Sequence, residues 1–332
     1  MGALGSDWFT TEAAVLAYLA DSALRSKDPY AHTQAHTRRG LTHTRVLTRE
    51  ATHEARWRQE HTPGRVGMKA VYLPNDRAFL RYIEVPGDDP PLLWLHGWQC
   101  SATGELMPAA VQAPLRGRRS LLIDFLGHGY SDKPPDFGYA REDHARTIVA
   151  LIDALGLSEC GLVGHSMGGA VAVHVATARA TIVSLLIMAE AAIDAGGEEP
   201  LGGQTEDQFV ERGFGELLEA QSREAEAQPD GLRAAHLGIT RLVEPRAIHR
   251  EAVSSLERGT NPSVRSLLRT LQMPRWYLQG EESDPEPDLQ HDLAAMGVGW
   301  KVVPKTGHPM GLQNPEGLAQ TVAEVLVASW PR

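Results

Sequence analysis

The chain has few cysteines, no long apolar run and no excess of positive charge. Of its 332 residues only 2 are cysteines, Cys100 and Cys160. That is too few for a disulfide framework and fits a reducing compartment, although a single bond between the two stays open. No apolar run approaches the roughly 20 residues that cross a bilayer, and Asp7 and Glu12 stand where a signal peptide would carry Lys or Arg. We therefore predict a cytoplasmic protein.

The charge balance excludes other classes of partner. Asp and Glu outnumber Lys and Arg by 42 to 32, a formal net charge of -10, so nucleic acid and anionic membranes would repel most of the surface. His32 and His36 stand four residues apart, as two zinc ligands on a helix would, but no further ligand accompanies them and we interpret them as a solvated face. We expect a small-molecule substrate, no metal and no cofactor.

What is present divides the chain into an extension, a core and an insertion. Residues 1–64 are predicted to be a largely helical extension, because apolar residues recur at helical spacing from Thr10 to Ser26. Its role stays open between packing on the insertion, supporting a homodimer and holding a partner chain.

Short apolar strands alternate with helices over residues 65–193 and 272–332. Alternation of this kind predicts an α/β fold with a mostly parallel sheet of about eight strands flanked by helices. Between these two parts, residues 194–271 lack the strand pattern and are predicted to form a helical cap over the strand ends.

A G-x-S-x-G sequence lies where a strand runs directly into a helix. In GHSMGG the serine is Ser166, with Gly164 and Gly168 two residues to either side. Such a sharp turn needs small residues at these places, and the helix N-terminus then directs N–H groups toward the reacting atoms. Ser166 is therefore a candidate nucleophile.

Three further segments stand around this serine in a fixed order. They are LLWLHGW, which ends at Trp98, DFLGHGYSDKP, which runs from Asp124 to Pro134, and GHPMGLQNPE, which contains His308. With the serine turn, they resemble the α/β-hydrolase family over residues 66–332, leaving the extension outside. The resemblance implies that Ser166 is the nucleophile, that His308 is its base, and that the segment with His128 is mainly architectural.

The same resemblance implies an oxyanion hole. Its two donors would be the backbone N–H groups of Trp98, after the His-Gly pair, and Met167, after the nucleophile. We also interpret the side chains of Trp98 and Met310 as candidates for substrate binding, since both flank the predicted site.

The acid of the triad is the member that departs from the family pattern. In most of the family it follows the seventh strand, but there Ser283 occupies the expected position, with Asp284 one residue late and Glu281 two early. The alternative is Glu190, at the end of the sixth strand and 24 residues after Ser166, an interval similar to that in haloalkane dehalogenases. We favour Glu190, with Asp284 as the alternative and Glu281 third.

A serine nucleophile favours acyl transfer, since the dehalogenase and epoxide-hydrolase branches of the family use an aspartate. The resemblance thus implies a hydrolase of an ester, thioester or lactone that passes through an acyl-enzyme. The alternatives are a non-hydrolytic enzyme of the same fold, such as an acyltransferase, lyase or cyclase, and a catalytically silent binding protein.

Overall fold

The computed structural model of the chain describes residues 67–193, 201, 203–228, 231–256, 262–284 and 287–330. The predictions for the extension, including the helix from Thr10 and the pair His32 and His36, lie outside these residues. So does the beginning of the predicted insertion, at 194–200.

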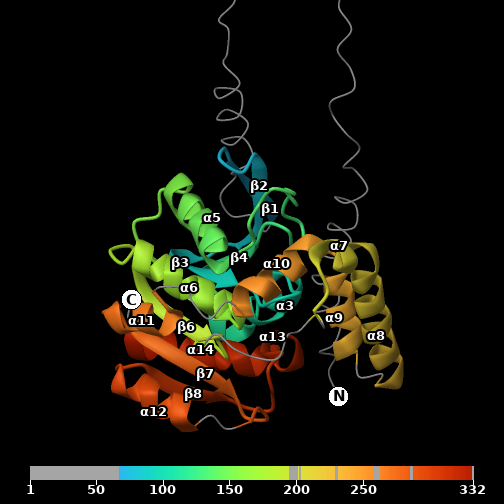
Figure 1. The fold of residues 1–332 in the computed structure, drawn as a ribbon. Coiled ribbons are helices and arrows are strands. Elements are labelled where there is room, and N and C mark those ends of the chain that lie inside the picture. The colour runs from blue at the N-terminus through green and yellow to red at the C-terminus, as the bar shows by residue number, and fades with distance from the viewer. Residues whose placement is uncertain are drawn as a thin grey trace, which may run out of the picture. The chain divides into compact units, whose positions relative to one another are not determined.

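The predicted eight-stranded, mostly parallel sheet is confirmed (Figure 1). Its spatial order is β1-β2-β4-β3-β5-β6-β7-β8, in which β1, β2 and β4 pair antiparallel and all other neighbours pair parallel. The strands are β1 (Gly67–Leu73), β2 (Ala78–Val85), β3 (Asp88–Leu95), β4 (Arg118–Asp124), β5 (Cys160–His165), β6 (Val183–Ala189), β7 (Arg275–Gly280) and β8 (Gly299–Val303).

The central strands are apolar on both faces because helices flank the sheet. All of β5 is buried, as are the last five residues of β3 and of β6, which is why they occur in the sequence as continuous apolar runs. Helices α5 (Arg141–Ala154) and α11 (Val264–Thr270) both pack on α6 (Met167–Ala178). A second group joins α4 (Met107–Ala110), η1 (Ala113–Leu115), α13 (Met310–Gln313) and α14 (Pro315–Ser329). The remaining core helices are α3 (Ala102–Glu105) and α12 (Pro287–Ala295).

The elements of the insertion between β6 and β7 are all helical in its described residues. The insertion contains α7 (Glu206–Gln208), the π-helical turn η2 (Phe209–Gly213), α8 (Phe214–Ala227), α9 (Leu232–Thr240), α10 (Pro245–Leu256) and α11. Helices α8 and α9 pack together, and α10 contacts α7 and η2, whereas α11 packs on α6. The contacts therefore group α7 to α10 together, and we call these four helices with η2 the candidate cap, whereas α11 belongs with the helices that cover the sheet.

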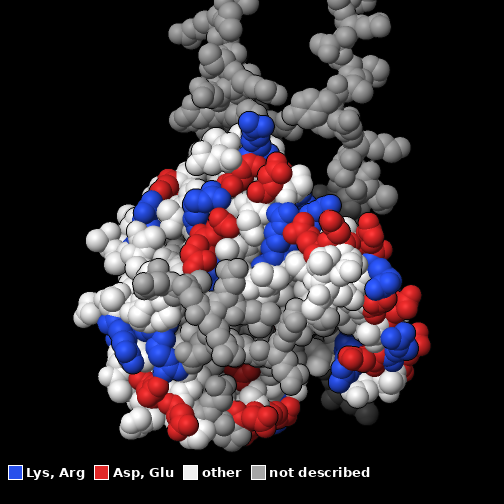
Figure 2. Space-filling model, viewed as in Figure 1, with Lys and Arg blue, Asp and Glu red and all other residues white. Residues whose placement is uncertain are grey.

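Charges of both signs are mixed on the face drawn in Figure 2. Around α8, for example, Arg212 of η2 pairs with Glu216, and Arg233 of α9 pairs with Glu224, so charges of opposite sign offset one another there. Among the described residues, no helix combines the length and apolar character that spanning a membrane requires. Cys100 and Cys160 are both buried and free, so no disulfide bond joins them.

Candidate active site

Ser166 stands at a tight turn between β5 and α6. Its backbone has φ 52° and ψ -119°, a conformation that costs a non-glycine residue energy and is common at functional sites. The turn is close because a β-carbon on Gly164 would lie 2.4 Å from the carbonyl oxygen of Gly168, and one on Gly168 would lie 2.3 Å from that of Leu95. Only glycine fits at either place, and the serine is held at the C-terminal end of the parallel strands.

His308 lies in the loop between β8 and α13, with its ring against that of His165, the residue before the serine. The two ring centroids are 4.8 Å apart. The Nδ1 atom of His308 lies 2.7 Å from Oε2 of Glu190, while the other carboxylate oxygen of Glu190 accepts the backbone N–H of Gly280 at 2.8 Å. This geometry places the Nδ1 proton of His308 toward the carboxylate and leaves Nε2 for a reacting group.

Glu190 follows directly after β6 and is well enclosed. Its side chain is 10% exposed, against 56% for His308. Burial raises the pKa of Glu190, but hydrogen bonds from His308, from the hydroxyl of Ser283 and from the amide of Gly280 outweigh burial and lower it. The carboxylate is therefore ionised near neutral pH and suited to stabilise an imidazolium.

The other candidate acids lie elsewhere in the structure. Asp284 is exposed, and its backbone carbonyl accepts a hydrogen bond from the side chain of Gln279. Glu281 accepts the backbone N–H of Lys305. Ser283, which occupies the usual position of the acid, donates to Glu190 instead, so the hydroxyl there supports a carboxylate that comes from the neighbouring strand.

The loop after β3 lies against the serine turn. A β-carbon on Gly97 would lie 3.2 Å from Cβ of Ser166, which brings the next residue, Trp98, to the edge of the site. The indole of Trp98 donates to the backbone carbonyl of Ile248 in the cap helix α10, at 3.1 Å. Met167 is the first residue of α6, and the first N–H groups of a helix have no partner within it.

Met310 does not have the surroundings predicted for a substrate-binding residue. It is the first residue of α13, its backbone N–H donates to the carbonyl of His308 at 2.8 Å, and its side chain has no exposed surface. Apolar character and closeness to His308 in sequence predict a pocket-lining role, and full burial of the side chain does not by itself indicate one.

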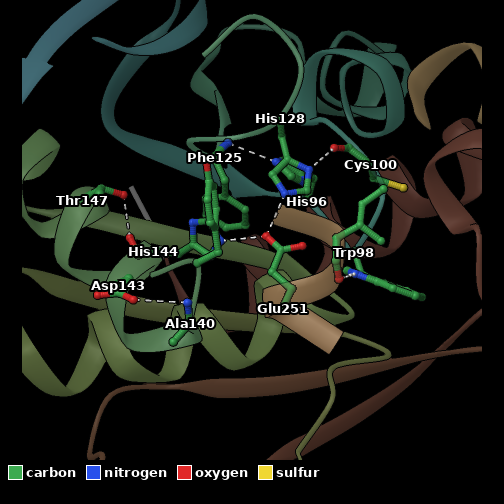
Figure 3. A network of polar contacts seen from close by, with 12 residues as sticks. His96, Trp98, Cys100, Phe125, His128, Ala140, Asp143, His144, Thr147 and Glu251 are labelled. Carbon is green, nitrogen blue, oxygen red and sulfur yellow. Dashed lines mark hydrogen bonds and ion pairs between the residues drawn. The ribbon is translucent and has the colours of Figure 1, made fainter. Parts of the chain in front are cut away.

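His128 lies in a buried polar network with His144 of α5 and Glu251 of α10 (Figure 3). Oε1 of Glu251 is 2.7 Å from Nε2 of His128 and 2.8 Å from Nε2 of His144. These are hydrogen-bond distances, whereas two ligands of a tetrahedral zinc ion at about 2.1 Å each would stand roughly 3.4 Å apart. We therefore interpret the network as hydrogen bonds that join the cap to the core.

The proton arrangement in this network follows from its partners. Nδ1 of His128 lies 2.9 Å from the carbonyl oxygen of Cys100, which only accepts, so Nδ1 carries the hydrogen. Burial lowers the pKa of His128 to about 3 and raises that of Glu251. A neutral His128 then has a lone pair on Nε2. The hydrogen between this Nε2 and Oε1 of Glu251 therefore belongs to a protonated Glu251.

The groove between η1 and α14 lies away from this site. Its lining includes Arg116, Arg118 and Trp330. Arg118 begins β4 whereas Ser166 follows the end of β5, and both strands run parallel to β3 between them. The groove is thus at the opposite edge of the sheet from the serine.

The sequence patterns do not indicate two residues of the site region. Glu105 and His165 form a buried ion pair beside the serine turn, yet His165 stands only at the variable position of G-x-S-x-G. The available signal was a lone acid, Glu105, in a stretch of small and apolar residues after the His-Gly loop.

Comparison with known proteins agrees with the fold. The sequence model described as "Alpha/beta hydrolase family" matches residues 92–321, and the chain belongs to this family. Haloalkane dehalogenase 2 of Mycobacterium tuberculosis is 32% identical over 118 residues, 35% of this chain and 40% of that protein. The sn-1-specific diacylglycerol lipase ABHD11 of Mus musculus is 36% identical over 113 residues, 33% of this chain and 36% of that protein. The matches thus span less than half the length of either relative.

Solved structures resemble the chain over most of its length. A thermophilic esterase from Thermogutta terrifontis superposes with a TM-score of 0.66 at 20% identity, covering 79% of this chain and 98% of that one. A thioesterase domain from the curacin biosynthetic pathway superposes with a TM-score of 0.60 at 18% identity, covering 78% and 99%. At these identities the likeness shows the shared fold.

Proposed function

We propose that the protein is a serine hydrolase of a carboxylic ester, thioester or lactone. The observation that carries the proposal is the contact of 2.7 Å between His308 Nδ1 and Glu190 Oε2, made beside the serine turn. It supports a nucleophile, a base and an acid in the roles of Ser166, His308 and Glu190.

In the proposed reaction, Nε2 of His308 removes the hydroxyl proton of Ser166 as its oxygen attacks the carbonyl carbon of the substrate. The carboxylate of Glu190 stabilises the imidazolium that forms. The backbone N–H groups of Trp98 and Met167 hold the oxyanion, an arrangement worth about 3 to 4 kcal/mol per donor in comparable sites. His308 then protonates the leaving group, and water attacks the acyl-enzyme with His308 as base again.

The branch of the family that cleaves carbon–halogen bonds is represented among the relatives, and the residue at the turn distinguishes the two chemistries. A dehalogenase needs a carboxylate nucleophile there, and this chain has Ser166. A hydroxyl activated by a histidine favours acyl transfer.

The test combines covalent labelling with turnover. A fluorophosphonate probe is expected to label the wild type and not Ser166→Ala. The control variant Ser184→Ala is expected to label normally, because Ser184 lies near the N-terminal end of β6 and Ser166 lies at the C-terminal edge of the sheet. A series of p-nitrophenyl esters of increasing acyl length is expected to be hydrolysed by the wild type and not by His308→Ala. Labelling without turnover of any ester would instead indicate an acyl acceptor other than water, and no labelling at all would refute the proposal.

A further inference from the structure

A second buried acid–histidine pair lies beside the proposed triad, and the mechanism above does not use it. Oε1 of Glu105, at the end of α3, is 2.7 Å from Nδ1 of His165, the residue before Ser166. Glu105 is 1% exposed and His165 is 3% exposed. Ions so deeply buried are stable only with a partner of opposite charge and with their remaining polar atoms satisfied.

Both ring nitrogens of His165 face acceptors. Nε2 lies 2.8 Å from the backbone carbonyl oxygen of His308, which cannot donate, so Nε2 carries a hydrogen. Nδ1 faces the carboxylate of Glu105, whose other oxygen accepts the backbone N–H of Gly97 at 3.1 Å. With an ionised Glu105, both nitrogens of His165 carry hydrogens and the ring is an imidazolium.

The electrostatic surroundings agree with this arrangement of protons. Burial raises the pKa of Glu105, but the facing His165 and the amide of Gly97 outweigh it and lower the pKa to about 2. Burial lowers the pKa of His165, but Glu105, the carbonyl of His308 and the more distant Glu190 outweigh it and raise the pKa. His96, after β3, and His236 of α9 also lie near the pair, and burial lowers the pKa of both rings, that of His96 to about 3. The thiol of Cys100 contacts Glu105 as well, and burial raises its pKa, so it stays neutral.

The pair joins three segments that the proposed reaction needs in register. Glu105 holds the loop of Gly97, from which the oxyanion donor Trp98 follows. His165 belongs to the serine turn, and its ring holds the backbone of His308. The backbone of Glu105 is also in close contact with α13, since a β-carbon on Gly311 would lie 2.3 Å from the carbonyl oxygen of Glu105.

We propose that Glu105 and His165 are positioning residues, whose ion pair fixes the oxyanion loop, the nucleophile and the base relative to one another. This inference rests on the proposed function. Neither side chain touches the reacting atoms; the pair acts through the backbone of Gly97 and of His308. Misplacement of reacting groups by about 1 Å costs on the order of 100-fold in rate, which sets the scale of the expected effect.

The test removes the charge or one of the two contacts. Glu105→Gln keeps an oxygen for the amide of Gly97 but cannot hold an imidazolium. His165→Gln keeps a donor near the position of Nε2, and His165→Asn keeps one near that of Nδ1. Each variant is expected to lower kcat about 10- to 100-fold while KM changes by less than about three-fold, because the substrate is still bound but the reacting groups are misaligned.

The matched control is Glu84→Gln, which removes another partly buried, ion-paired carboxylate, on β2. It is expected to lower the midpoint of urea unfolding and leave kcat unchanged. A folded Glu105→Gln with wild-type kcat would overturn the inference, as would a fall in kcat that Glu84→Gln reproduces.

A second readout uses the wild type alone and does not depend on a variant that folds. Nitrogen-15 spectra of the histidine rings, recorded just above the usual histidine pKa of about 6.5, are expected to show both nitrogens of His165 still protonated. A singly protonated His165 there overturns the inference. A wild type that neither turns over esters nor labels with fluorophosphonate refutes the proposed function, an outcome distinct from an active enzyme that tolerates Glu105→Gln.

Discussion

Replacement of Glu190 by glutamine changes which nitrogen of His308 carries the hydrogen. The carboxylate of the wild type accepts from three donors, Nδ1 of His308, the backbone N–H of Gly280 and the hydroxyl of Ser283. A glutamine amide offers one oxygen and one NH₂ group. With its oxygen toward Gly280, it donates to Nδ1 of His308, the hydrogen of the ring moves to Nε2, and the ring can no longer accept the proton of Ser166.

The magnitude follows from the cost of the opposite orientation. Turning the amide so that its oxygen faces His308 leaves its NH₂ group against the N–H of Gly280, and an unsatisfied buried donor costs about 1–3 kcal/mol. At about 1.4 kcal/mol for each factor of ten, the inactive tautomer is favoured roughly 5- to 150-fold. The charge that stabilises the imidazolium is lost in addition, and the equivalent change in a serine protease lowers kcat about 10⁴-fold. We expect kcat of Glu190→Gln to fall by about 10² to 10⁴.

The assay is steady-state hydrolysis of the best p-nitrophenyl ester, with Asp284→Asn and Glu281→Gln as matched controls. Both control variants also replace a carboxylate by its amide within the loop after β7, and both are expected to retain kcat within about two-fold because neither side chain contacts His308. Near wild-type turnover by Glu190→Gln, or a large loss in Asp284→Asn, would refute the assignment of the acid.

Three other side chains give separate predictions. Asp124→Asn leaves one of several buried donors, including the N–H of Tyr130, without an acceptor, and urea unfolding is expected to show a loss of about 1–3 kcal/mol. Trp98→Phe removes the hydrogen bond to Ile248 in the cap; we expect KM for esters to rise up to about five-fold with little change in kcat, and an unchanged KM would count against a role for this contact in placing the cap. Burial raises the pKa of Glu251 in the folded protein. The contribution of this group to the free energy of unfolding is therefore complete at pH values below its pKa in the unfolded chain, and it is lost as pH rises through its pKa in the folded protein. Urea unfolding across this range should therefore show that the free energy of unfolding falls more steeply with rising pH for the wild type than for Glu251→Gln. Parallel profiles would show that Glu251 is ionised in the folded protein.

The sheet could be predicted from sequence because burial on both faces leaves a strong local record. Strands such as Leu92–Leu95 and Leu185–Ala189 are continuous apolar runs, and the serine turn and its glycines are constrained by contacts within a few residues. The helical character of the insertion was equally visible. The grouping of α11 with α6 was not, because helical spacing shows that a face is apolar but not which surface covers it.

The side-chain network around the serine depends on contacts that sequence does not display. Glu105 and His165 are 60 positions apart, and neither belongs to a spacing that indicates catalysis. Met310 shows the converse difficulty, since its place beside His308 suggested a pocket while its side chain has no exposed surface. In both cases the deciding quantity is the direction of a side chain, which follows from tertiary packing.

The position of the acid illustrates why two places in a sequence can supply one role. Strands β6 and β7 are parallel neighbours in register, with Ala189 opposite Leu278, so the residues that follow them emerge side by side at one edge of the sheet. A carboxylate after either strand can reach the same imidazole. In this chain the residue after β6 supplies the carboxylate of Glu190. The end of β7 and the loop after it supply two donors to this carboxylate, the amide of Gly280 and the hydroxyl of Ser283. An aspartate in place of Ser283 would set two carboxylates against each other and raise the pKa of one of them, so a serine at that position is the residue type that a glutamate at 190 requires.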